Sequence, residues 1–149
     1  MKQGFVKVAS ATPRIRVADP VYNAQVICEQ AKEAAEHGAK IVVFPELCIT
    51  GYTCNDLFLQ ELLLEKAKEA LLTIAEETGQ LETLFLVGLP VDKDGRLYNV
   101  AAVLYRGRIL GMIPKKNIPM YAEFYEGRHF TPGEETVTEY RLGKQVIPF

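Results

Sequence analysis

Hydrophobic and polar residues recur with two different periods along this chain, and the two periods predict strands and helices in turn. Apolar residues alternate with polar or small residues over 5–10, which predicts a first strand. Helical spacing follows, in a helix that begins at Asp19-Pro20 and ends at Gly38. Residues 40–44 carry no polar side chain after the first, so we predict a strand that is buried on both faces or lies at a sheet centre.

The rest of the chain is predicted to hold one more helix and five more strands. The helix covers 57–78, with a break near Gln60. The predicted strands are 84–88, then 97–105 and 108–113 as a hairpin across Arg106-Gly107 after a turn at 91–96, and two within 136–149. The order β-α-β-α-β-β-β predicts helices packed on one face of a mixed sheet.

Composition and charge narrow the class of protein. A chain of 149 residues with 48% hydrophobic residues is long enough for one domain with a real core. The net charge of -2 offers no basic field for nucleic acid, and no apolar run is long enough to span a membrane, so we expect a cytoplasmic protein. The odd number of cysteines, Cys28, Cys48 and Cys54, shows no disulfide or zinc pattern.

Glu46 is the strongest candidate for chemistry. It follows the predicted strand 40–44 and Pro45, and a polar, glycine-containing loop comes after it. A carboxylate in such a position can act as a general base, because a rigid scaffold aims it and a low dielectric tunes it. An ordinary strand-ending carboxylate bound to nearby amides is an equally good interpretation at this point.

Further candidates lie in the aromatic, charged and turn-rich segment 114–132, which has the composition of a site-forming loop. Lys115 could stabilise the oxyanion of a tetrahedral intermediate, although most lysines are simply solvated. Glu123 could position Lys115 or bind a substrate ammonium group, or it could form a surface salt bridge with Arg128 or Lys116. The aromatic residues that could wall a substrate pocket, or merely fill core, are Tyr52, Tyr121 and Phe124.

Two motifs resemble the signature of a known enzyme superfamily. Residues 44–52, Phe-Pro-Glu-Leu-Cys-Ile-Thr-Gly-Tyr, resemble the glutamate motif of the nitrilase superfamily, and Pro114-Lys115 with Ile118-Pro119 resembles its lysine motif. Residues 98–103 look like a central strand of that superfamily. The stretch 119–130 is most similar to the glutaminase domains of glutamine-dependent NAD synthetases.

This resemblance implies an α/β fold, the nitrilase-like α-β-β-α sandwich, and a set of roles. Glu46 matches the general base, and Lys115 matches the lysine that stabilises the tetrahedral intermediate. Glu123 matches a second glutamate that orients the site. Residues that match positions near a bound glutamine are Tyr52, Tyr121 and Phe124. The resemblance also implies a homo-oligomer in which helices pack across an interface.

The chain departs from that family in its nucleophile. No cysteine follows Lys115; Cys28 lies on an apolar helix face, and Cys48 and Cys54 lack the strand-to-turn setting of a nucleophile. We therefore expect 1–149 to be the N-terminal part of a glutaminase domain that is inactive alone. The expected whole enzyme would pass ammonia from glutamine to deamido-NAD, and its ATP and Mg²⁺ would serve a separate synthetase domain.

Two other functions stay open on the sequence. A stand-alone nitrilase-superfamily amidase or carbamoylase would share both motifs, because a fold-level match does not define a substrate. A non-catalytic scaffold module would explain the missing nucleophile. We expect no metal or cofactor to bind to residues 1–149.

Overall fold

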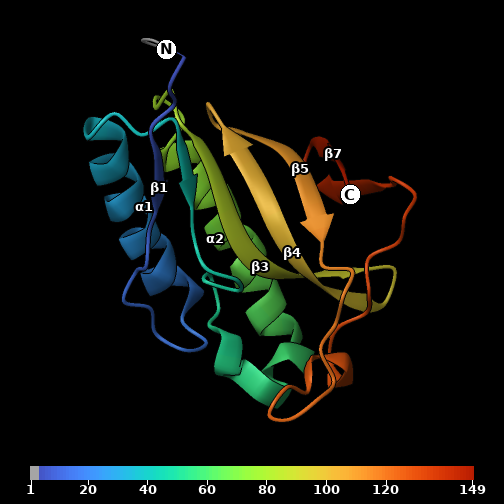
Figure 1. The fold of residues 1–149 in the computed structure, drawn as a ribbon. Coiled ribbons are helices and arrows are strands. Elements are labelled where there is room, and N and C mark those ends of the chain that lie inside the picture. The colour runs from blue at the N-terminus through green and yellow to red at the C-terminus, as the bar shows by residue number, and fades with distance from the viewer. Residues whose placement is uncertain (1–3) are drawn as a thin grey trace.

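The computed structural model describes residues 4–149, in which a five-stranded sheet is covered by two helices on one face (Figure 1). The strands lie in chain order. β1 (Val8–Ser10), β2 (Ile41–Val43) and β3 (Leu84–Lys93) are parallel, and β4 (Arg96–Tyr105) and β5 (Arg108–Pro114) continue the sheet antiparallel to their neighbours. This is the mixed sheet with one helical face that the order of elements predicts.

Both helices connect parallel strands, and their caps follow the sequence signals. α1 (Pro20–Glu36) begins after Asp19, whose carboxylate accepts a hydrogen bond from the Tyr22 amide at 3.1 Å. Gly38, with φ of 82°, follows its end. The predicted break near Gln60 is confirmed, since it separates the 3₁₀ segment η1 (Tyr52–Leu59) from α2 (Glu61–Glu77).

Two strand predictions need correction. β3 runs through the predicted turn as far as Lys93, so that the reversal is confined to Asp94-Gly95, both with positive φ. β2 is an internal strand, as one of the two predicted alternatives had it, but it is not buried on both faces. Val42 faces the helices and is fully buried, whereas Val43 points the other way and is 44% exposed.

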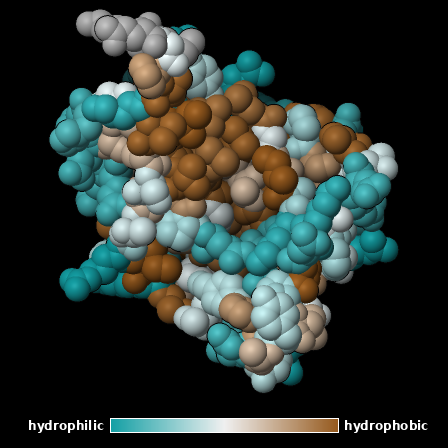
Figure 2. Space-filling view, in the orientation of Figure 1, coloured by the Kyte–Doolittle hydropathy of each residue, from teal (hydrophilic) through white to brown (hydrophobic). Residues whose placement is uncertain are grey.

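The face of the sheet opposite the helices is apolar and open. Figure 2 shows a broad hydrophobic area across this face, bordered below by a hydrophilic band. Valine and isoleucine side chains on alternate strand positions form it, and the most exposed members are Val8, Val43 and Ile113. An apolar area of this kind exceeds what isolated surface residues produce and is typical of a contact surface.

A second hairpin lies beside the free edge of the sheet (Figure 1). β6 (Glu139–Leu142) and β7 (Gln145–Pro148) pair antiparallel, which confirms the prediction of a strand-turn-strand unit within 136–149. Tyr140, Leu142 and Ile147 are buried in the main core.

Within the described part of the chain, no helix is both long and apolar enough to cross a bilayer.

Candidate active site

Glu46 lies in a tight turn that follows β2 and packs against the middle of β3. The next four residues, Leu47 to Thr50, are 0–1% exposed, and the Ile49 amide donates to the Gly88 carbonyl at 3.1 Å. Gly88 lets the turn approach closely. A Cβ there would lie 2.4 Å from the Leu47 nitrogen and 2.8 Å from the Pro45 oxygen, too near for any other residue without a shift of the backbone.

Lys115 and Asn99 are placed by the β4–β5 hairpin. The Lys115 amide donates to the Asn99 carbonyl at 2.8 Å, one step beyond the paired residues Val100 and Pro114. Residues directly opposite each other in an antiparallel pair project from the same face. Both side chains therefore leave the sheet on the side where the turn of Glu46 arrives.

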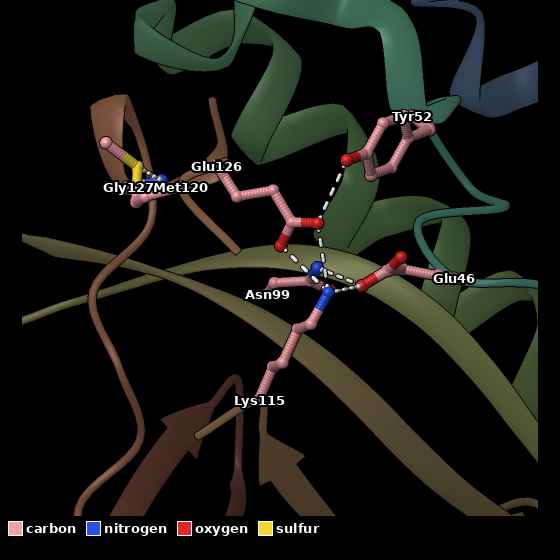
Figure 3. A network of polar contacts seen from close by, with 7 residues as sticks. All are labelled: Glu46, Tyr52, Asn99, Lys115, Met120, Glu126 and Gly127. Carbon is pink, nitrogen blue, oxygen red and sulfur yellow. Dashed lines mark hydrogen bonds and ion pairs between the residues drawn. The ribbon is translucent and has the colours of Figure 1, made fainter. Parts of the chain in front are cut away.

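Figure 3 shows that these elements meet in one polar network. Glu46 Oε1 accepts hydrogen bonds from Lys115 Nζ at 2.7 Å and from Asn99 Nδ2 at 2.6 Å. Lys115 Nζ also donates to both carboxylate oxygens of Glu126, at 3.0 and 2.9 Å. Tyr52 Oη completes the chain by donating to Glu126 Oε1 at 2.9 Å.

One ammonium group is thus shared by two carboxylates. The Glu126 side chain is 5% exposed, whereas those of Lys115 and Glu46 are 30% and 40% exposed. Partial burial by itself lowers the pKa of Lys115, but hydrogen bonds and charge from Glu46 and Glu126 outweigh it and raise that pKa. Lys115 consequently stays a cation at neutral pH, as an oxyanion-stabilising group must.

The phenol of Tyr52 is held in its neutral form. Burial, followed by its hydrogen bond to Glu126 and the charge of that carboxylate, raises the pKa of Tyr52 to about 12. A neutral phenol donates its proton to Glu126 across the physiological range. Tyr52 therefore orients the carboxylate that orients Lys115.

The network borders an apolar hollow of about 400 Å³ on the open face of the sheet. Glu46, Asn99 and Lys115 lie at its polar end, and strand residues such as Val43, Leu86 and Ile113 line the remainder. A few convergent polar groups at one end of an apolar concavity is the usual form of a small-molecule site.

The structure brings together some of the residues predicted for the site. Glu46, Lys115 and Tyr52 belong to the network, although their chemical roles remain predictions. Within residues 4–149, Glu123 makes no hydrogen bond or ion pair with Lys115, and the second carboxylate that bonds the lysine is Glu126. The role of Glu123 in orienting the site or binding substrate stays a prediction. Glu123 instead lines a cavity of about 170 Å³ with Tyr52 and Phe130.

The two other predicted aromatic residues are not members of the network. Tyr121 is 69% exposed, and its ring packs edge-on against Phe124 at 5.5 Å between centroids. Neither makes a side-chain hydrogen bond to the network in the part of the chain that the structure describes. Their role in substrate binding therefore stays a prediction.

A polar clasp fastens the loop that carries Glu126 to η1. Arg128 donates to both carboxylate oxygens of Asp56, each at 2.9 Å, and His129 Nε2 lies 3.0 Å from Asp56 Oδ1. Hydrogen bonds from Arg128 and His129 lower the pKa of the Asp56 carboxyl. Phe130, next along the loop, packs on Phe58 of η1 with a 5.0 Å separation between ring centroids.

The three cysteines are buried, and their thiols are held in the protonated form. Burial raises the pKa of Cys28 to about 11 and that of Cys48 to about 12, and it also raises the pKa of Cys54. The Cys48 thiol points to the Gly88 carbonyl at 3.7 Å, and the Cys54 thiol to the Thr50 carbonyl at 3.2 Å. A thiol must be ionised to act as a nucleophile, and burial disfavours the ionised form of all three.

Two network residues escaped the sequence analysis, and only Asn99 had a local signal. Asn99 is a lone amide within the otherwise largely apolar predicted strand 97–105, and a buried polar residue in such a setting needs a specific partner. Glu126 stands three residues after Glu123 in a loop without periodicity. It was distinguishable only by the short 3₁₀ turn it begins, η2 (Glu126–Arg128).

Comparison with known proteins adds a family. The model of the carbon-nitrogen hydrolase family matches residues 7–147. The glutamine-dependent NAD(+) synthetase of Mycobacterium bovis is 38% identical over 148 residues, which is 99% of this chain and 22% of that protein. The synthetase of the same name from Thermotoga maritima is 36% identical over 135 residues, 91% of this chain and 23% of that protein. The chain thus spans about a fifth of the length of these relatives.

Solved structures agree on the fold. A glutamine-dependent NAD(+) synthetase from Cytophaga hutchinsonii superposes with a TM-score of 0.90 at 29% identity, covering 97% of this chain and 25% of that one. An amidase from Nesterenkonia sp. gives a TM-score of 0.71 at 24% identity, covering 96% and 54% of the two chains. The nitrilase-like architecture expected from the motifs is therefore confirmed.

Proposed function

The chain belongs to the carbon-nitrogen hydrolase family, and from that premise we propose that its polar network is the acid–base part of a site that hydrolyses a carboxamide. The observation that carries the proposal is the Lys115 ammonium, bonded at once to Glu46 and Glu126 beside an apolar hollow. The arrangement supplies a base and a fixed positive charge within one hydrogen bond of each other.

The proposed reaction divides into two acyl transfers, with a thiol as nucleophile. Glu46 takes the thiol proton as sulfur bonds to the amide carbon, and Lys115 stabilises the oxyanion that forms. Glu46 then returns the proton to nitrogen as the carbon–nitrogen bond breaks and ammonia leaves. Water next attacks the thioester, giving its proton to Glu46, and the thiol is regenerated with release of the carboxylic acid.

The nucleophilic thiol is not assigned to any residue of this chain. Cys28, Cys48 and Cys54 are buried with raised pKa values, which argues against each. We propose that 1–149 is the N-terminal part of a nitrilase-like glutaminase domain, and that the nucleophile comes from residues outside these 149. On this proposal the 149-residue chain alone releases no ammonia from an amide substrate.

Glutamine is the amide that we propose as substrate, because the curated relatives are named glutamine-dependent NAD(+) synthetases. Ammonia would then be delivered for the amidation of deamido-NAD. ATP and Mg²⁺ would serve a synthetase domain and not the residues described above. Tyr52, Tyr121, Glu123 and Phe124 are proposed to contact glutamine, and assembly into a cytoplasmic homo-oligomer completes the proposal.

The decisive experiment measures ammonia release from glutamine by the protein expressed from its complete reading frame. We expect turnover in the wild type and at least a ~10³-fold lower kcat in Glu46→Gln, which keeps the shape of the side chain but removes the base. Glu139→Gln, an exposed carboxylate on β6, is the matched control and should retain full activity. Unchanged turnover in Glu46→Gln would refute the proposed role of the network.

Substrate identity is tested in the same assay. Simple aliphatic amides and carbamoyl compounds are offered alongside glutamine at equal concentration. Preference for one of those amides would replace glutamine as the substrate and favour a stand-alone amidase. Activity of the isolated 149-residue chain that survives replacement of Cys48 and Cys54 would overturn the assignment of the nucleophile to other residues.

A further inference from the structure

Asn99 is a buried amide whose side chain has one evident task. It is 4% exposed, lies in the apolar strand β4, and directs its Nδ2 to Glu46 Oε1 at 2.6 Å. A buried polar side chain in the middle of a sheet is costly unless its partner repays the desolvation. The partner of Asn99 is Glu46, the carboxylate that acts as the base in the proposed function.

The two oxygens of Glu46 are not equivalent. Oε1 accepts from both Lys115 and Asn99, and a carboxylate oxygen has about two lone-pair positions, so Oε1 is saturated. Oε2 accepts no hydrogen bond from residues 4–149, and Figure 3 shows it directed away from both donors. A proton can therefore be exchanged at Oε2 without breaking the network.

We propose that Asn99 is a positioning residue for Glu46. It holds Oε1 in a fixed place by a second hydrogen bond, so that Oε2 is the oxygen that accepts and returns protons. The inference rests on the proposed function, in which Glu46 is the base. The terminal torsion of a glutamate is broad, so a carboxylate held by one donor can turn and offer either oxygen. A second donor on the same oxygen removes that freedom.

An amide, and not a carboxylate, is required at position 99. The network already holds two carboxylates against one ammonium, so aspartate would add a third negative charge 2.6 Å from Oε1. The amide must also face Oε1 with its N–H, because Oε1 of a carboxylate has no proton to donate. Asparagine is the residue of this length that is neutral and a donor.

Asn99 also ties Lys115 and Glu46 to the same backbone unit. Its carbonyl accepts the Lys115 amide at 2.8 Å while its side chain holds Glu46. The distance between the base and the ammonium is therefore set by one residue of a fully paired strand. A displacement of about 1 Å in a reacting group can cost about 100-fold in rate.

The test is steady-state kinetics of glutamine hydrolysis with the protein from its complete reading frame. Asn99→Ala should lower kcat about 10–100-fold and change KM less than about 3-fold, because the substrate does not bind to the amide. Asn99→Asp should be slower still. Thr83→Val is the matched control, since it removes another buried side-chain hydrogen bond, from Thr83 to the Ala39 carbonyl, outside the site.

A double-mutant comparison separates positioning from general support of the fold. Glu46→Asp withdraws the carboxylate by one methylene, beyond the reach of the Asn99 amide. In that background Asn99→Ala should cost less than about 2-fold, because the contact it removes is already lost. A full 10–100-fold loss in both backgrounds would overturn the inference, as would an Asn99→Ala enzyme that behaves like Thr83→Val.

A crystal structure of Asn99→Ala keeps the inference testable if glutamine is not hydrolysed at all. That result would defeat the proposed function by itself, without deciding what Asn99 does. We expect the Glu46 carboxylate to be rotated or disordered in the variant. A carboxylate still bonded to Lys115 through Oε1 alone, with Oε2 unmoved, would overturn the role of Asn99.

Discussion

The two carboxylates that share Lys115 are held by opposite means. Glu46 is exposed but sits on a turn whose following residues are buried and bonded to the middle strand of the sheet. Glu126 is buried but sits in a loop of mostly exposed residues, fixed by η2, the contact of Phe130 with Phe58, and the polar clasp of Asp56, Arg128 and His129. The first is positioned by the core, and the second by contacts between two loops.

This difference has a chemical meaning. In the proposed mechanism the general base has to keep one geometry through several proton transfers, which a turn anchored in the core provides. The carboxylate beside the ammonium has only to keep that ammonium charged and oriented, so it tolerates a more adaptable support. Damage to the first region should therefore be severe and damage to the second graded.

The largest effect is expected from Gly88→Ala, because this substitution disturbs the core-anchored turn that carries Glu46. The added Cβ would meet the backbone of Pro45 to Leu47 and must push the turn of Glu46 off β3. We expect a loss of about 3 kcal/mol in the free energy of unfolding and at least ~100-fold in kcat. Gly111→Ala on β5, where the new Cβ has only an ordinary 3.8 Å contact, is the control in thermal unfolding and activity assays.

Glu126→Gln comes next, because it removes a charge from Lys115 while preserving the shape of the side chain. We expect kcat to fall about 10–100-fold, since the lysine keeps only one carboxylate partner. Glu123→Gln is the informative comparison, and its kcat should stay within about 2-fold of the wild type even if KM changes. Equal losses of kcat in the two variants would contradict the assignment of the orienting role to Glu126.

Tyr52→Phe should have a smaller effect of about 5-fold in kcat/KM. It deletes the hydrogen bond to Glu126 but leaves the ion pair with Lys115 in place. The pKa of Tyr52 is about 12, so its phenol does not ionise near pH 10. The pH–activity profiles of the wild type and of Tyr52→Phe should therefore have the same shape around pH 10. Tyr105→Phe, on β4 near the hairpin turn, controls for loss of a hydroxyl elsewhere.

Arg128→Ala should have the smallest effect on rate, about 2-fold, because the clasp is exposed and its ion pair is screened. The visible change should be faster amide hydrogen exchange in the loop around Glu126. The pKa of Asp56 is lowered, so the clasp is complete above the ordinary carboxyl pKa of about 4 and is lost as pH falls through the lowered value. That acid-dependent loosening should be weaker in Arg128→Ala, where only His129 still bonds Asp56, but persist in full in Arg106→Ala, whose ion pair with Glu82 lies elsewhere.

The same contrast explains how much could be predicted from the sequence. The mixed sheet, both helices, the break at Gln60 and the hairpin across Arg106-Gly107 all follow from hydrophobic period and turn residues, which act locally. Glu46 and Lys115 were predictable because each lies within three residues of a strand end. Strand ends place side chains at a known edge of the sheet.

The loop residues were harder, for a physical reason. Residues 115–138 have no repeating period, so the choice between Glu123 and Glu126 depends on where one 3₁₀ turn forms and on contacts with η1 that are distant in sequence. The length of β3 was underestimated because Pro90 and Asp92 look like turn residues, yet both are paired with β4. Asn99 was missed because its partner, Glu46, is 53 positions away.

The β4–β5 hairpin contains a β-bulge, and the bulge sets the register that decides on which face of the sheet Lys115 lies. Leu104 pairs with Ile109 but Val103 pairs with Gly111, so β5 contains one residue more than β4 between the turn and Lys115. If the register of Leu104 and Ile109 continued without the bulge, Lys115 would oppose Tyr98 and project through the other face of the sheet, toward the helices. The register therefore decides whether the ammonium meets Glu46: if the bulge closed with every residue kept, Lys115 would turn to the other face of the sheet although every functional residue remained in the chain.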